Sequence, residues 1–128
     1  MIKLNRYVDI STLNKEAKKD YIDRHSAFIK CDTEATAGEL FPVVVRVGDQ
    51  YPHPDDFDHY IAYVQLFDGE RLVGQMNLTP GSIFGAGKSG NLHVTFNLFP
   101  TKKMKLTAVA YCTKHGLWES DTVKVDVK

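Results

Sequence analysis

The sequence predicts an all-β protein: an immunoglobulin-like antiparallel β-sandwich that follows a short N-terminal helical arm. Two observations predict this fold. From residue 27 onward apolar residues recur at every second position, and turn-forming residues separate the alternating runs. About seven such runs in a chain of 128 residues are typical of an immunoglobulin-like sandwich. The length fits a single domain, which we divide into an arm of residues 1–24 and a sandwich of residues 25–128.

The arm contains the expected helix, over residues 11–23. Asp9 or Ser11 can cap its beginning, because a short side-chain oxygen accepts a hydrogen bond from the free N–H groups of a first helical turn. We therefore expect a short helix or an ordered arm before the first strand.

The strands follow in order along the rest of the chain. The clearest is 40–48, where every second residue from Phe41 to Val47 is apolar, so that one face is strongly apolar. Turn signals lie at 68–69, 81–90 and 100–101. The expected strands cover residues 27–31, 40–48, 60–67, 71–79, 91–99, 103–112 and 121–127.

Composition excludes several classes of protein. The 16 basic and 16 acidic residues cancel, which leaves no electrostatic footprint for nucleic acid or for an anionic membrane. Two cysteines are too few for the disulfide framework of a small secreted domain. Residues 1–10 lack the apolar core of a signal peptide, and no stretch approaches the length of a membrane span. We expect a cytoplasmic protein with reduced thiols.

Four histidines and one cysteine stand where strands begin or end. His25 precedes the first expected strand, and His53 and His59 lie in Tyr-Pro-His-Pro-Asp-Asp-Phe-Asp-His. Cys112 and His115 occur in Tyr-Cys-Thr-Lys-His-Gly-Leu-Trp, where a gap of two residues lets sulfur and imidazole nitrogen reach one ion across a tight turn. Together these side chains predict one metal site.

The donor atoms narrow the choice of metal. Nitrogen and sulfur suit a transition metal better than calcium or magnesium, which prefer oxygen. Ligand type leaves zinc open, whereas five ligands around an ion with one open position favour iron or copper. We interpret Cys31 as a small, partly buried residue and His93 as a solvent-facing strand residue, and assign neither a role.

These residues resemble the superoxide reductases of the one-iron, neelaredoxin type, a module that also forms the iron-binding part of desulfoferrodoxin. The resemblance runs from about residue 23 to the end of the chain and is most specific over 111–120. It implies one iron ion per chain, held by equatorial His25, His53, His59 and His115 and by axial Cys112. It also implies an oxidoreductase that reduces superoxide to hydrogen peroxide, an electron donor such as rubredoxin, and a homodimer or homotetramer.

Two departures from the family pattern stand near the predicted site. The family usually has Glu-Lys-His-Val-Pro where this chain has Asp-Arg-His-Ser-Ala at 23–27. The resemblance implies that Asp23 replaces a glutamate that can occupy the sixth position of oxidised iron, and that Arg24 replaces a lysine that attracts the anion. The second departure is the presence of three carboxylates, Asp55, Asp56 and Asp58, which oppose capture of an anion unless Arg24 and Lys114 dominate the local field. Alternatively, these carboxylates dock a basic partner.

Three alternatives follow from the same residues. Asp23 and Arg24 can be no more than a solvated ion pair at the end of the arm. The chain can be a non-enzymatic iron-binding or redox-sensing domain on the same fold. It can also be an interaction module without metal, in which the histidines are incidental.

Overall fold

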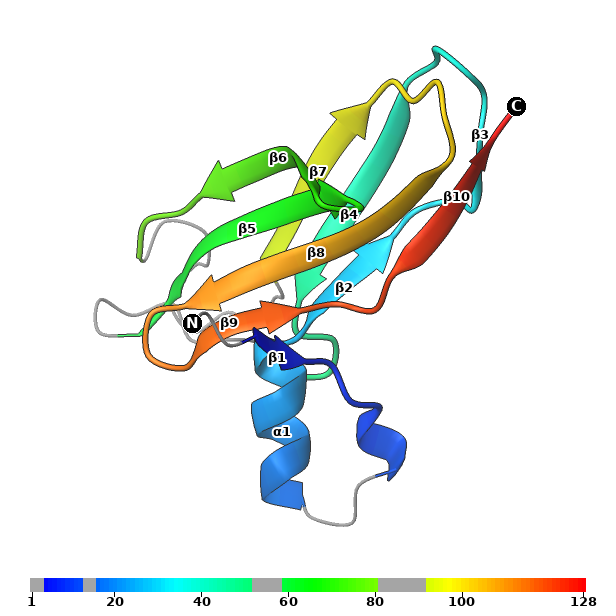
Figure 1. The fold of residues 1–128 in the computed structure, drawn as a ribbon. Helices are drawn as coiled ribbons and strands as arrows, with labels where there is room; N and C mark the ends of the chain where they lie inside the picture. Colours follow the sequence, from blue (N-terminus) through cyan, green and yellow to red (C-terminus); the bar gives the residue numbers. More distant parts are fainter. Residues whose placement is uncertain (1–3, 13–15, 52–58, 81–91) are drawn as a thin grey trace.

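Two β-sheets face each other in the computed structural model, which describes residues 4–12, 16–51, 59–80 and 92–128 (Figure 1). Within these ranges the small sheet has three strands, β2 (Ala27–Lys30), β4 (Phe41–Val47) and β7 (Leu92–Leu98). The large sheet has seven strands: β1 (Leu4–Arg6), β3 (Glu34–Ala35), β5 (Ile61–Asp68), β6 (Arg71–Asn77), β8 (Met104–Cys112), β9 (Gly116–Glu119) and β10 (Val123–Val127).

Strand β8 is the centre of the large sheet. It pairs antiparallel with β5 along one side, and β5 pairs with β6. On its other side β8 has two partners: β9 pairs with the end that contains Cys112, and β10 with the end that contains Met104. Strands β1 and β3 extend the sheet in parallel beside β9 and β10. The two ends of β8 therefore support two different parts of the molecule.

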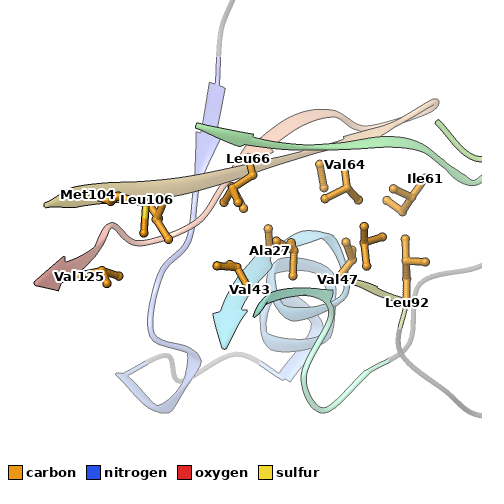
Figure 2. Close-up of a cluster of buried hydrophobic side chains, with 14 of the residues drawn as sticks. Ala27, Val43, Val47, Ile61, Val64, Leu66, Leu92, Met104, Leu106 and Val125 are labelled. Carbon is orange, nitrogen blue, oxygen red and sulfur yellow. The ribbon is translucent and has the colours of Figure 1, made fainter. Parts of the chain in front are cut away.

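The apolar core lies between the sheets (Figure 2). In β4, the middle strand of the small sheet, Val43, Val45 and Val47 have no exposed surface, and Leu66 and Leu106 of the large sheet are equally buried. Burying one such side chain contributes about 1.5–3 kcal/mol to stability. The period-two pattern of residues 40–48 thus reflects a strand that turns one face to the core.

The prediction of an all-β, two-sheet protein is confirmed. Each of the seven expected segments contains an observed strand, and β1, β3 and β9 are additional. The sheets are not purely antiparallel, since the β1–β9 and β3–β10 pairs are parallel. Two parallel strands need a long connection between them, and each of these pairs joins strands that are far apart in sequence. The immunoglobulin-like arrangement and the arm boundary after residue 24 stay predictions. Strand β1, which lies before that boundary, pairs with β9 of the large sheet.

The arm contains a short 3-10 helix, η1 (Ile10–Thr12), and one α-helix, α1 (Glu16–His25). Asp9 caps η1, because its Oδ1 accepts hydrogen bonds from the backbone N–H of Ser11 at 3.0 Å and from its hydroxyl at 2.8 Å. Helix α1 lies at the end of the sandwich beside β1 and β9 (Figure 1). Among the described residues, no helix is long and apolar enough to cross a bilayer.

Candidate metal centre

Four side chains that can ligate a metal converge at the α1 end of the sandwich. They are His25, His59, Cys112 and His115, and their ligand atoms all lie within 4.8 Å of one another. They come from four elements: His25 ends α1, His59 precedes β5, Cys112 ends β8, and His115 lies in the turn to β9. The fold therefore brings residues 25, 59 and 112–115 to one point, although about ninety residues separate the first from the last.

The β8–β9 hairpin fixes Cys112 against His115. Cys112 pairs with Gly116, whose φ of 86° is in the left-handed region that glycine adopts without a Cβ penalty. The turn directs the backbone N–H of His115 to Cys112 Sγ at 3.4 Å and places His115 Nδ1 3.6 Å from the same sulfur. At the far side of the turn, Trp118 donates its indole N–H to the carbonyl oxygen of His115 at 3.2 Å. Both candidate ligands are thus held by backbone geometry.

Pairing between β5 and β8 brings His59 to the same point. The N–H of Thr113 donates to the carbonyl oxygen of Tyr60 at 3.0 Å, and the N–H of Tyr60 donates to the Thr113 hydroxyl at 3.3 Å. This exchange holds the start of β5 beside the hairpin turn. As a result His59 Nε2 lies 3.1 Å from His115 Nδ1, close enough for both nitrogens to bind one ion.

His25 is oriented by its own helix and by the rings of Tyr21 and Trp118, which we call the aromatic wall. Its side chain is 1% exposed, and its Nδ1 lies 2.6 Å from the carbonyl oxygen of Tyr21. Because a carbonyl only accepts, Nδ1 is the protonated nitrogen, and Nε2 carries the lone pair that a metal requires. The ring stacks on Trp118, with 5.1 Å between centroids, and touches Tyr21 at 4.7 Å. His25 is therefore locked in one tautomer and one orientation.

Electrostatics at the centre favour neutral imidazoles. Burial lowers the pKa of His25 to about 4, so the ring is neutral at pH 7. Burial also lowers the pKa of His115, and the nearby charges of Lys114 and Arg24 add to this effect. Both cations lie close enough to His115 to lower its pKa, although the whole chain is neutral.

Burial raises the pKa of the Cys112 thiol, and hydrogen bonds from the backbone N–H groups of Lys114 and His115 oppose that rise. A bound transition metal favours the thiolate, because its positive charge lies next to the sulfur. Three imidazoles and one soft sulfur therefore fit a transition metal such as iron. Zinc also accepts this donor set.

Four of the five predicted metal ligands are brought together. The fifth, His53, lies outside the described residues, as do Asp55, Asp56 and Asp58. His93 is exposed on β7, in the other sheet, where it pairs with Arg46. Cys31 follows β2, and burial together with the charge of Asp32 raises its pKa, which makes it a poor nucleophile near neutral pH.

Asp23 is not a solvated residue at the end of an arm. It is 2% exposed, and its Oδ2 accepts hydrogen bonds from the backbone N–H groups of Asp49, Gln50 and Tyr51 at 3.0, 2.8 and 2.8 Å. The solvated-pair alternative is therefore wrong for Asp23. A direct role of Asp23 or Arg24 at the metal stays a prediction.

Sequence reasoning missed the aromatic wall. Tyr21 contacts the rings of His25 and His115, at 4.7 and 5.2 Å, and Trp118 at 5.5 Å. The spacing of Tyr21 and His25, four residues apart in a helix, was a usable signal, because such residues lie on the same helical face. The sequence held no comparable signal for the hydrogen bonds of Asp23, which join segments 26–28 residues apart.

Comparison with known proteins decides the family. The model of the desulfoferrodoxin family matches residues 13–121, which include the four clustered ligands. The chain belongs to the desulfoferrodoxin family. A superoxide reductase from Pyrococcus furiosus is 33% identical over 110 residues, covering 77% of this chain and 86% of that protein. A neelaredoxin from Megalodesulfovibrio gigas is 30% identical over 109 residues, covering 77% and 84%.

Solved structures of desulfoferrodoxin relatives share the fold. A variant of the superoxide reductase (neelaredoxin) from Ignicoccus hospitalis has a TM-score of 0.74 at 26% identity, covering 98% of this chain and 94% of that chain. Another structure of the same protein has a TM-score of 0.67 at 29% identity, covering 81% of each chain. The predicted resemblance to neelaredoxin-type superoxide reductases is confirmed, and so is the prediction of an oxidoreductase. The desulfoferrodoxin family also implies iron as the metal.

Proposed function

We propose that this chain reduces superoxide to hydrogen peroxide at a single iron ion. The proposed ligands are His25, His53, His59 and His115, with Cys112 axial. One observation carries the proposal: three imidazoles and one thiol from four elements place their ligand atoms within 4.8 Å of one another, in a chain of the desulfoferrodoxin family.

The bound iron supplies the one electron that, with two protons, converts superoxide to hydrogen peroxide. The protein holds the ligand atoms in place, because hydrogen bonds and stacking fix His25 and the hairpin turn fixes Cys112. The backbone N–H of His115, 3.4 Å from Cys112 Sγ, withdraws electron density from the sulfur and so tunes its donation to the metal. These contacts are all made by the chain itself.

Arg24 and Lys114 attract the anionic substrate. Both charges act on His115 strongly enough to lower its pKa, so both lie within electrostatic reach of the centre. A positive field at a site mouth raises the association rate of a small anion, and added salt weakens this effect. Arginine keeps its proton, so Arg24 attracts and hydrogen-bonds while the two protons come from water.

The proposal also includes partners and location. We propose that a small donor protein such as rubredoxin returns the electron, that the chain forms a homodimer or homotetramer, and that it works in the cytoplasm. Among the described strands β6 pairs with β5 alone, and its seven residues include exposed Leu72 and Met76. This supports self-association, because the free side of such a strand can pair with a second copy of the chain.

Metal analysis and rapid mixing test the proposal. We expect about one iron per chain in purified protein, a visible sulfur-to-iron charge-transfer band in the ferric form, and rapid loss of the ferrous state when it is mixed with superoxide. Hydrogen peroxide should form in proportion to the iron oxidised. Protein that takes up no iron, or ferric protein that lacks the band, contradicts the proposal.

A second candidate is a non-enzymatic iron-binding or redox-sensing domain. The hydrogen bonds of Asp23 favour this second candidate. Its Oδ2 accepts from three backbone N–H groups, so the carboxylate has a structural role. Slow oxidation of fully iron-loaded ferrous protein by superoxide would support the sensor and exclude the reductase.

A further inference from the structure

A group of hydrogen bonds joins the end of α1 to the turn that follows β4. The four consecutive backbone N–H groups of residues 48–51 all donate to the segment around His25. That of Gly48 donates to the carbonyl oxygen of Ser26 at 2.9 Å, and the next three donate to Asp23 Oδ2 at 2.8–3.0 Å. We call Asp23 together with residues 48–51 the Asp23 clasp.

Several interactions stabilise the Asp23 clasp. A buried carboxylate is costly unless it is hydrogen-bonded, and bonds from N–H groups to a charged oxygen are about twice as strong as neutral ones. Gly48 has a φ of 81°, and a Cβ at this position would collide with the carbonyl oxygen of Tyr51. Arg46 closes the turn from the other side, since its guanidinium contacts both the carbonyl oxygen and the carboxylate of Asp49, at 3.2 and 2.9 Å.

The Asp23 clasp acts on both sides of His25. Asp23 precedes His25 by two residues and Ser26 follows it directly, and both are hydrogen-bonded to the 48–51 turn. Ser26 also donates its hydroxyl to the carbonyl oxygen of Ile22 at 2.6 Å, which closes the last turn of α1. The backbone of His25 is therefore held on both sides, at Asp23 and at Ser26, while its ring is held by Tyr21 and Trp118.

We propose that Asp23 is a positioning residue for the metal centre. Its carboxylate fixes the end of α1 on the 48–51 turn and thereby sets where His25 presents Nε2. Asp23 then acts through His25, while its Oδ2 stays bound to the three N–H groups. This inference rests on the proposed function for the identity of the metal, whereas the Asp23 clasp itself is independent of metal.

Amide hydrogen exchange in the metal-free protein tests the Asp23 clasp directly. We expect the N–H groups of Asp49, Gln50 and Tyr51 to be protected in the wild type and to exchange at least about tenfold faster in Asp23→Ala. Asp23→Asn keeps the shape and one acceptor oxygen, so its rates should be intermediate. Asp9→Asn is the matched control, because Asp9 lies in the same arm and accepts from Ser11 outside the clasp.

Iron binding tests the positioning role. We expect the affinity for Fe²⁺, measured by competition with a chelator, to fall about 10- to 100-fold in Asp23→Ala, as for other residues that orient metal ligands. The ferric charge-transfer band should shift, because His25 moves. Asp23→Asn should recover part of both losses, and Asp9→Asn should change neither. A role in stability alone would lower the melting temperature and leave the band in place.

Each contrary result has a clear meaning. Unprotected amides at 49–51 in the wild type overturn the inference, even if Asp23→Ala does not fold. Faster exchange with unchanged iron affinity and an unchanged band overturns the positioning role. A wild-type protein that binds no iron overturns the proposed function instead, and the exchange rates still decide whether Asp23 holds the turn.

Discussion

Cys112 has no exposed surface, and its thiol lies against the turn that contains His115. Burial in apolar surroundings would keep such a thiol protonated and inert, as the upward direction of its pKa indicates. Two backbone N–H groups point at the sulfur, however, and they favour the thiolate. This combination suits a sulfur that ionises when a cation arrives.

We expect Cys112→Ala to abolish both the ferric charge-transfer band and the reduction of superoxide. No other sulfur belongs to the described cluster of ligand atoms, so nothing there replaces the lost donor. Absorption spectra of iron-loaded protein and rapid mixing with superoxide measure the two effects. Cys31→Ala is the matched control and should keep both, since Cys31 is outside the cluster. Retention of the band in Cys112→Ala would contradict the ligand assignment.

Single residues show what the sequence could and could not predict at the site. The pair Cys112 and His115 was predictable, because two intervening residues and a glycine specify the turn locally. The tautomer of His25 was not, since it depends on a helical carbonyl oxygen. The hydrogen-bond partners of Asp23 were not predictable either, because they belong to a turn that lies close to Asp23 only in the folded chain.

Among the elements, the turn after β4 acts on the centre through Asp23, which accepts hydrogen bonds from three of its backbone N–H groups. It begins at Gly48, and Gly38, before β4, has nearly the same φ, at 78°. The surroundings of the two glycines differ: a Cβ at position 38 meets nothing within 4 Å, whereas one at position 48 collides with the Tyr51 carbonyl. A substitution at Gly38 therefore measures backbone strain alone, and one at Gly48 measures backbone strain together with a steric clash.

We expect Gly38→Ala to lower the free energy of unfolding by about 1–2 kcal/mol, the cost of a left-handed conformation with a Cβ. Gly48→Ala should cost at least about 1 kcal/mol more, because the turn must also shift. Urea unfolding of the metal-free proteins measures both values. Equal losses in the two variants would show that the turn accommodates a methyl group.

Strand prediction succeeded wherever a strand was long enough to repeat its pattern. Segments such as β4 and β8 have seven and nine residues, so several buried positions alternate with outward ones. Strands β1 and β3 have three and two residues, which is too few to show a period. Strand β9 has four residues, like β2, but only Trp118 of the four is buried, so no alternation marks it. The helix was expected over 11–23, whereas residues 10–12 form the 3-10 helix η1 and α1 covers Glu16–His25. Ser26 closes the final turn of α1 through its hydrogen bond to Ile22.

On the scale of the whole molecule, a bound metal would connect the end of α1 to the start of β5 and to the β8–β9 hairpin. One ligand, His25, ends helix α1, and the others come from the large sheet, at the start of β5 and in the β8–β9 hairpin. A metal that binds only the folded protein stabilises it by an amount that depends on free metal and affinity.

We expect removal of iron to lower the melting temperature by about 10 °C, if free metal exceeds the dissociation constant about 100-fold before removal. The reason is that four described ligands lose their common partner. Thermal unfolding followed by circular dichroism, with and without a chelator, measures the change. In Cys112→Ala the chelator should have a much smaller effect. An equal effect in the variant would mean that iron stabilises the protein from another site.

The opposite ends of β8 have a practical consequence for surface attachment. Cys112 lies at one end, while β10, which leads to Lys128, pairs with the Met104 end, eight residues or about 26 Å away. A protein attached to an electrode through a linker on Lys128 would turn the Cys112 end of β8 toward solution. A linker before Leu4, in β1 beside the hairpin strand β9, would instead attach the protein close to its metal centre.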